Sequence, residues 1–312
     1  MVAEGKERTY FFKKSIYHRI VPIFQFADGL FPCGNSSTDH TFRFIKYNCP
    51  NLKSFLDDVV GKTLDHHIPP IASIVKLTKK AHEDDRRKVT GDLYIKHLFY
   101  TAYLADEMIK EKKYYKPNKK KLLLATSFLH DTIELRRKRR ETEDYSPKNF
   151  YYFLKSAELK GITPRDIKKI VAMVALMTPK DKPPNMPVDE WREIKREDFQ
   201  RLMNITRNEV LEVVGTLGEF DGIHITEDEA DDMVEIIKDV KTAEVIANLR
   251  ETADDIIWKR EVKDGVPNMK DFIYRFEMFN ERVNYMMELP LDEKYKQQMQ
   301  EDMEQLTEFV RS

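Results

Sequence analysis

The stretch LLLATSFLHDTI, residues 122–133, decides the fold of this chain. Its apolar residues cover more than one face of a helix, so the pattern predicts a helix that is buried on several sides. The helix ends in the adjacent pair His130-Asp131, and ionisable residues at the end of a buried helix need partners. Imidazole and carboxylate groups suit divalent transition metals, and at a helix end both can reach one ion. The dipeptide alone is weak evidence for a metal site, because it is common by chance.

The composition of the chain favours an all-helical, soluble protein. Its 312 residues, 41% of them hydrophobic, can bury a sizeable core, and only 10 are glycine, whereas barrels and doubly wound sheets need many turns. The formal net charge of -1 gives no overall attraction to nucleic acid or an anionic membrane, so neither is expected as a partner. No apolar run approaches the ~18 residues of a membrane span. Cys33 and Cys49 form no CxxC motif, and we expect a reducing, cytoplasmic setting.

Three regions can be distinguished along the chain. Residues 1–70 mix aromatic residues with turn-forming ones and are interpreted as an N-terminal extension of unassigned role. Pro69-Pro70 interrupts the chain, and helical spacing begins beyond it, which marks the start of a domain over residues 71–290. Residues 291–312 form an amphipathic helical tail, which either packs on the domain or mediates a homodimer.

Helix starts within the domain are marked by hydroxyl residues that precede apolar-periodic runs. Ser146, Thr163 and Thr226 are predicted to be helix N-caps on this pattern. Four prolines exclude a helix from residues 177–187, so this stretch is expected to be a long loop. The loop either borders a functional site or is a passive connector.

Two further predicted helices carry polar residues that need an explanation. His97 stands at the start of one of them, although a lone histidine there is more often an ordinary core or surface residue. Glu244 lies within the buried apolar stripe of the other, and a lone buried carboxylate is costly unless a cation or hydrogen bonds compensate it. An ion pair with an arginine would compensate this carboxylate just as a metal ion would. Asn248, one turn further on the same face, adds a second polar group.

Three segments of the sequence together resemble a known family. They are AHEDDRRKVTGDLYIKH at residues 81–97, LHDTIE at 129–134 and VKTAEVIANLR at 240–250. In this order they are similar to the hydrolase domain of the Rel/SpoT homologues, which belong to the HD superfamily of metal-dependent phosphohydrolases. Those enzymes remove the 3'-pyrophosphate from the alarmone (p)ppGpp. The resemblance implies an all-α HD-domain helical bundle, preceded here by the N-terminal extension.

The resemblance also implies a set of metal ligands. His97, His130 and Asp131 match ligand positions of the family, and Glu244 stands where the family usually has an aspartate. The family suggests manganese, although these ligands would also accept iron, cobalt, zinc or magnesium. The longer side chain of Glu244 would shift the ion or the backbone slightly.

Catalytic and substrate-binding residues follow from the same resemblance. Glu134 matches an acidic residue that positions or deprotonates the attacking water, whereas Leu135 occupies the place of a second acidic residue. Asn248 matches an asparagine near the nucleotide. Arg87 and Lys88 match basic residues at the substrate pocket, with one extra residue after them that leaves their register open.

These inferences predict a metal-dependent phosphohydrolase that acts on a nucleotide, with removal of the 3'-pyrophosphate of (p)ppGpp as the expected reaction. Two alternatives stay open. One is a phosphohydrolase for another nucleotide, which Leu135 favours. The other is a degenerate HD protein that binds a nucleotide and regulates without turnover, which Leu135 and Glu244 favour together. Retention of the histidines, of Asp131 and of Glu134 argues against this second alternative.

Overall fold

The structure, a computed structural model, is all-α. Among the residues that it describes, the regular elements are helices and no strand occurs. No helix in that part of the chain combines the length and the apolarity needed to cross a membrane. The described residues are 44–45, 47–52, 54–55, 59, 70–82, 85, 94–112, 116–134, 146–179, 182–183, 185–217, 222–262 and 269–311.

Helices build the described part of the fold. In chain order they are α4 (Pro70–Ala81), α5 (Ile95–Glu111), α6 (Pro117–Leu129), α8 (Pro147–Ser156), α9 (Pro164–Met177), α10 (Val188–Met203), α11 (Arg207–Thr216), α12 (Glu227–Val262), α13 (Met269–Met287) and α14 (Glu293–Arg311).

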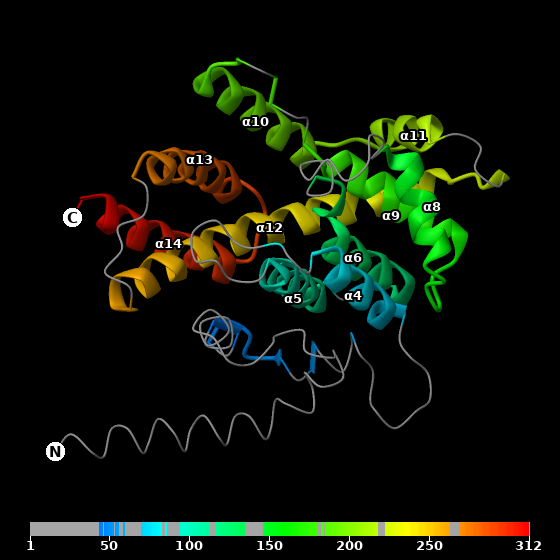
Figure 1. Cartoon of the computed structure of the whole chain (residues 1–312), viewed down its shortest axis with the longest axis horizontal. Coiled ribbons are helices and arrows are strands. Elements are labelled where there is room, and N and C mark those ends of the chain that lie inside the picture. The colour runs from blue at the N-terminus through cyan, green and yellow to red at the C-terminus, as the bar shows by residue number, and fades with distance from the viewer. Residues whose placement is uncertain are drawn as a thin grey trace.

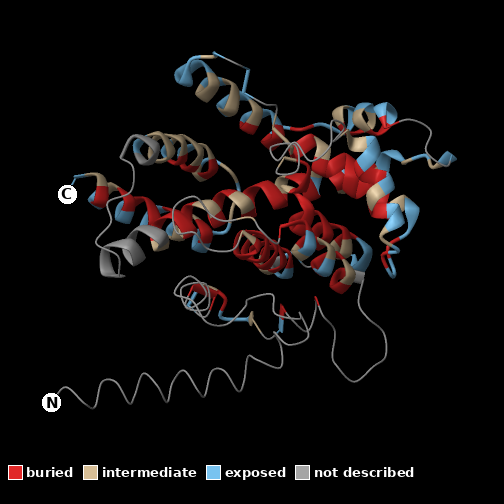
Figure 2. Cartoon of the chain, in the orientation of Figure 1, coloured by how far each residue is buried: buried red, intermediate tan, exposed pale blue. Residues whose placement is uncertain are grey.

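The long helix α12 is the axis of the bundle. Its 36 residues span about 54 Å at 1.5 Å per residue, and it crosses the middle of the molecule (Figure 1). Helices α9 and α11 pack near its start, α5 and α6 along its middle, and α13 and α14 toward its end (Figure 1). Helix α10 contacts both α12 and α13. Figure 2 shows that burial is concentrated on α12 and on the α5, α6 and α9 helices that cover it.

Helix α6 is buried on several sides, as its sequence predicts. All residues from Leu122 to Leu129 are buried, because α6 contacts α4, α5, α9 and α12. The helix begins at Pro117, earlier than the apolar pattern indicates, and a proline in the first turn sacrifices no helical hydrogen bond. His130 is its C-cap residue, so the polar pair stands where the buried helix ends.

The predicted helix starts and the predicted loop are confirmed. The side chains of Ser146, Thr163 and Thr226 each accept a hydrogen bond from the backbone N–H three residues later. Helix α9 ends at Met177 and α10 begins at Val188, so the proline-rich stretch between them is a loop. Local cap and turn chemistry therefore sets these element boundaries.

Described residues from the predicted N-terminal extension pack against α5. Phe44 and Phe55 are fully buried, and their rings stand edge-on to Tyr100 and Phe99 at centroid distances of 4.9 and 5.2 Å. These residues belong to the same hydrophobic cluster as the bundle. Most of residues 1–70 lies outside the described part of the chain.

The C-terminal tail packs on the bundle, which is one of its two predicted roles. Helix α14 buries an apolar face that includes Met299, Leu306 and Phe309. Its fully buried Asp302 lies with Oδ1 3.1 Å from Nε of Arg250 on α12. This interior ion pair joins the two helices, while the homodimer stays a prediction.

Replacing Thr163 by alanine tests the contribution of a predicted cap. The variant loses the side-chain acceptor of the α9 capping box, so we expect the free energy of unfolding to fall by about 1 kcal/mol. Urea denaturation followed by far-ultraviolet circular dichroism measures the change. The control is Ser156→Ala, because the exposed Ser156 hydroxyl bonds only the carbonyl of Phe153, and its effect should stay within about 0.5 kcal/mol. Equal losses in the two variants would contradict the capping role.

Candidate metal centre

Two histidines and an aspartate meet where α5 and the end of α6 come together. His97 lies in the first turn of α5, His130 caps α6, and Asp131 follows in the next turn. The Nε2 atoms of His130 and His97 lie 3.2 and 3.8 Å from Oδ2 of Asp131. One ligand atom from each of the three residues lies within 4.8 Å of the others. We call these residues the metal group, and they are three of the four predicted ligands.

Neighbouring groups orient the side chains of the metal group. His130 Nδ1 lies 2.7 Å from the carbonyl oxygen of Ser127. Because a carbonyl only accepts, Nδ1 donates this hydrogen bond and Nε2 is left to face Asp131. The Nε2 atom is buried and makes no hydrogen bond of its own. The Tyr94 hydroxyl donates to Asp131 Oδ2 at 2.6 Å, so a fixed carboxylate stands beside a buried imidazole nitrogen that a divalent ion could use.

The charges of the metal group perturb its pKa values. Burial by itself lowers the pKa of His130, but Asp131 and Glu244 attract the extra proton and raise the pKa to about 9. Burial raises the pKa of Asp131, and the positive charges of His130 and His97 outweigh that effect and hold it well below its usual range. The group is therefore built to hold a cation near neutral pH, and a metal ion would compete with the proton for Nε2.

The spacing of the metal group fits a metal ion. Donors that bind one ion at about 2.1 Å each lie no more than about 4.2 Å apart. The three ligand atoms lie within 4.8 Å of one another, so closing them on an ion needs shifts of about half an ångström. Two imidazoles and a carboxylate suit manganese, iron, cobalt and zinc.

Glu244, the predicted fourth ligand, lies in the same pocket and is paired with a lysine. Its Oε2 accepts a hydrogen bond at 2.8 Å from Nζ of Lys241, one turn earlier on α12. Burial raises the pKa of Glu244, but the charges of Lys241 and His130 outweigh burial and lower it. The compensating cation is thus a lysine of the same helix, not the arginine considered from the sequence. Ligation by Glu244 stays a prediction and requires Lys241 to share the carboxylate.

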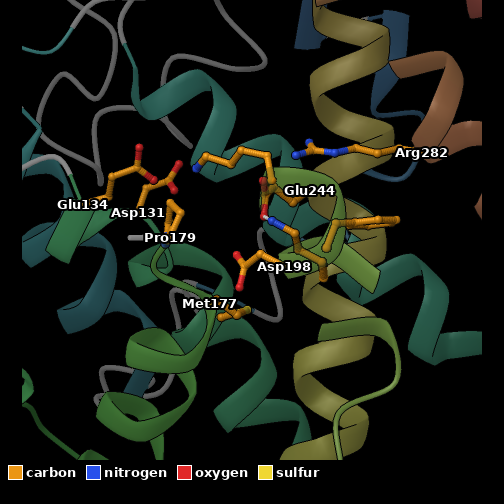
Figure 3. Close-up of a pocket in the computed structure, with 10 residues that line it drawn as sticks. Asp131, Glu134, Met177, Pro179, Asp198, Glu244 and Arg282 are labelled. Carbon is orange, nitrogen blue, oxygen red and sulfur yellow. Dashed lines mark hydrogen bonds and ion pairs between the residues drawn. The ribbon is translucent and has the colours of Figure 1, made fainter. Parts of the chain in front are cut away.

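A pocket opens beside the metal group. Its empty volume, including open solvent at the mouth, is about 440 Å³. Figure 3 shows Asp131 and Glu134 on one side, Glu244 in the middle and Arg282 reaching in from the opposite side. The lining consists of four carboxylates, three cations and three other residues, which are Asp131, Glu134, Asp198, Glu244, Lys195, Lys241, Arg282, Met177, Pro179 and Phe199.

The other predicted site residues have separate outcomes. Glu134 lines the pocket. Asn248 lies one turn further along α12 and is not among the described residues that line it. Arg87, Lys88 and Leu135 lie outside the described residues. The proline-rich loop contributes to the lining at its start, so it borders the pocket, which is one of its two predicted roles.

Sequence reasoning missed five charged residues of the site, which are Asp198, Lys195, Lys241, Glu251 and Arg282. Glu251 of α12 is fully buried, and its Oε1 lies 3.4 Å from Nδ1 of His97. Its place two helical turns after Glu244, on the same face, is the signal that could have revealed it. Lys195 and Arg282 come from α10 and α13, and only the long-range packing of these helices brings them to the pocket.

No family model, no curated protein and no solved structure matches this chain. The family resemblance therefore rests on the three sequence segments, and the chemistry of the site rests on its geometry.

The charge on His130 predicts how the stability of the metal-free protein depends on pH. The folded-state pKa of about 9 lies above the ordinary value of 6.5, so the stabilisation is complete below pH 6.5 and is lost as the pH rises through about 9. In EDTA, we expect the free energy of unfolding to fall between these pH values more steeply in the wild type than in His130→Gln. Urea denaturation measures both slopes, and equal slopes would contradict the ion pair with Asp131.

Glu251 is expected to tune metal affinity through His97. A carboxylate at the far nitrogen of a ligating histidine typically changes metal affinity by about 10- to 100-fold, so Glu251→Gln should weaken Mn²⁺ binding by that factor. Isothermal titration calorimetry with Mn²⁺ measures the change. The control is Glu304→Gln, which alters an exposed carboxylate of α14. Unchanged affinity in Glu251→Gln would refute the positioning role.

Proposed function

We propose that this protein is a metal-dependent phosphohydrolase of the HD superfamily and that it removes the 3'-pyrophosphate of (p)ppGpp. The observation that carries the proposal is the buried metal group at the edge of a pocket that also contains carboxylates and cations. Metal-ligating residues and phosphate-binding cations in one pocket suit the hydrolysis of a phosphate ester or anhydride. The order of the three resembling segments supports the alarmone as the substrate.

The proposed cofactor is Mn²⁺, with iron, cobalt, zinc and magnesium as alternatives. His97, His130 and Asp131 would hold it, with Glu244 as the fourth ligand. When bound, such an ion supplies Lewis-acid chemistry that makes a water molecule more acidic and offsets charge on a phosphoryl oxygen. The orphaned Nε2 of His130 supports this assignment.

Glu134 is proposed as the general base. It lines the pocket three residues after Asp131, and a carboxylate within reach of a water molecule can orient it and take its proton. The water oxygen then bonds to phosphorus. The bond from phosphorus to the nucleoside oxygen breaks, and that oxygen leaves with the electron pair and takes up a proton. In this proposal Lys241, which lines the pocket, offsets charge on the phosphoryl oxygens.

Asn248, Arg87 and Lys88 are proposed as nucleotide-binding residues on the strength of the family resemblance alone. The proposal includes a cytoplasmic location and a protein that acts as a monomer or a homodimer. Hydrolysis of another nucleotide would use the same ligands and the same base with different contacts to the nucleoside.

A second candidate function is a nucleotide-binding regulator without turnover. The ion pair between Glu244 and Lys241 favours it, because this pair occupies the carboxylate that would otherwise complete the ligand set. The two candidates differ in whether a bound nucleotide is hydrolysed.

Product analysis distinguishes these functions. The purified protein with Mn²⁺ is incubated with ppGpp and with a panel of other nucleotides, and pyrophosphate and phosphate are quantified. We expect pyrophosphate from ppGpp. Glu134→Gln should keep Mn²⁺ and lower kcat by about 10²- to 10⁴-fold, as loss of a general base does, whereas His130→Ala should lose both metal and turnover.

Matched surface variants provide the controls. His224→Ala and Glu193→Gln alter exposed side chains away from the pocket, and both should keep wild-type turnover. Release of pyrophosphate or phosphate from other nucleotides alone would change the assigned substrate and keep the assigned chemistry. Full turnover in both Glu134→Gln and His130→Ala would rule out the roles assigned to these two residues. Binding of ppGpp without product would favour the regulator.

A further inference from the structure

A tyrosine hydroxyl holds one particular oxygen of Asp131. Oδ2 of Asp131 lies 3.2 Å from Nε2 of His130 and 3.8 Å from Nε2 of His97, so it faces the rest of the metal group. The same oxygen accepts a hydrogen bond of 2.6 Å from the hydroxyl of Tyr94, the N-cap residue of α5. An O–H to carboxylate bond of this length is charge-assisted and strong. Because a carboxylate oxygen has two lone pairs, the bond uses one and leaves the other for an ion.

Three contacts fix the ring of Tyr94 in turn. It is stacked on the ring of His82, with the centroids 5.6 Å apart and an angle of 21° between the planes. It stands edge-on to the ring of His97, also at a centroid distance of 5.6 Å. The backbone N–H of Tyr94 donates to the carbonyl oxygen of Asp85 at 3.0 Å. The hydroxyl therefore reaches Asp131 from a ring that is held on both its face and its edge.

His82 connects this tyrosine to the chain around Asp131. It directly follows α4 and is only 2% exposed. Its Nδ1 lies 2.9 Å from Oδ2 of Asp85, and because a carboxylate only accepts, Nδ1 donates this hydrogen bond. Nε2, which lies 3.4 Å from Oγ1 of Thr132, is left to accept from that hydroxyl. Thr132 is the residue after Asp131, so His82 contacts both Tyr94 and the chain neighbour of the ligand.

Each polar contact of this small network leads to the same carboxylate. We infer that His82 and Tyr94 are positioning residues of the metal centre, which hold Asp131 with one oxygen toward His97 and His130 and so set the affinity for a divalent ion. Hydrogen-bond partners of metal ligands typically change metal affinity by about 10- to 100-fold. The inference deepens the proposed function and rests on it for the identity of the ligands, but not for any turnover.

Isothermal titration calorimetry of the full chain with Mn²⁺ tests this role. Tyr94→Phe keeps the ring and removes the hydroxyl, so we expect Mn²⁺ affinity to fall by about tenfold or more. His82→Ala removes the stacked ring and both hydrogen bonds, and a similar loss is expected. Because His82 acts partly through Tyr94, the double variant should lose less than the product of the two single losses. Urea denaturation in EDTA checks that each variant is folded.

The matched control is Tyr103→Phe. Tyr103 is a buried tyrosine of α5, and its hydroxyl accepts a hydrogen bond of 3.2 Å from the backbone N–H of Asn51. This variant also loses a hydroxyl hydrogen bond, so it should lose stability but bind Mn²⁺ like the wild type. The comparison separates a role at the metal centre from a role in folding alone.

The possible outcomes separate this inference from the proposed function. Wild-type Mn²⁺ affinity in either folded single variant, or an equal loss of affinity in Tyr103→Phe, would overturn the inference and leave the proposed function in place. Weakened Mn²⁺ binding in the variants of a protein that hydrolyses no nucleotide would support the inference and remove the proposed function. A wild type that binds no divalent ion would overturn both.

Discussion

The compensation of buried charge at the end of α6 is the constraint on which the rest of the structure depends. An apolar helix that is covered on several sides carries His130 and Asp131 into the interior. Charged groups there need partners, and α5 supplies one with His97. Helix α12 supplies Glu244, whose charge acts on His130, and Glu251, which lies beside His97. The packing of these three helices therefore compensates the buried charges and also sets the chemistry of the site.

Charges of both signs line the pocket beside the metal group. Four carboxylates and three cations face it, and two of the cations, Lys195 and Arg282, come from α10 and α13. The aromatic contact between Phe199 and Tyr285 joins these two helices. The proposed metal ion would add a further positive charge to this mixed lining.

Local patterns in the sequence were sufficient for the fold class and for much of the site. Apolar periodicity predicted the buried α6, and hydroxyl residues predicted the N-caps at Ser146, Thr163 and Thr226. His97 and the HD pair lie together, as their shared motif role required, while metal binding by them stays a prediction. These features succeed because each depends on residues close in sequence or on a motif. The start of α6 was placed too late, because its first turn is polar and the pattern followed only apolar residues.

Long-range geometry explains what the sequence could not supply. The hydrogen-bond partner of Glu244 is Lys241. This contact depends on the rotamers of both side chains, which the sequence does not specify. Lys195 and Arg282 reach the pocket only because α10 packs on α13 and α12, and no motif surrounds them. Glu251 was missed although it shares the face of α12 that carries Glu244, because its partner lies on another helix.

X-ray absorption spectroscopy of the Mn²⁺-loaded protein tests the central claim most directly, because it reports the atoms bonded to the ion. The account predicts one ion per chain, with the outer-shell scattering of two imidazole rings from His97 and His130 and with carboxylate oxygen from Asp131. A coordination shell of water and carboxylate oxygens without imidazole, or a folded protein that retains no ion, would contradict the assignment of this site as a metal centre.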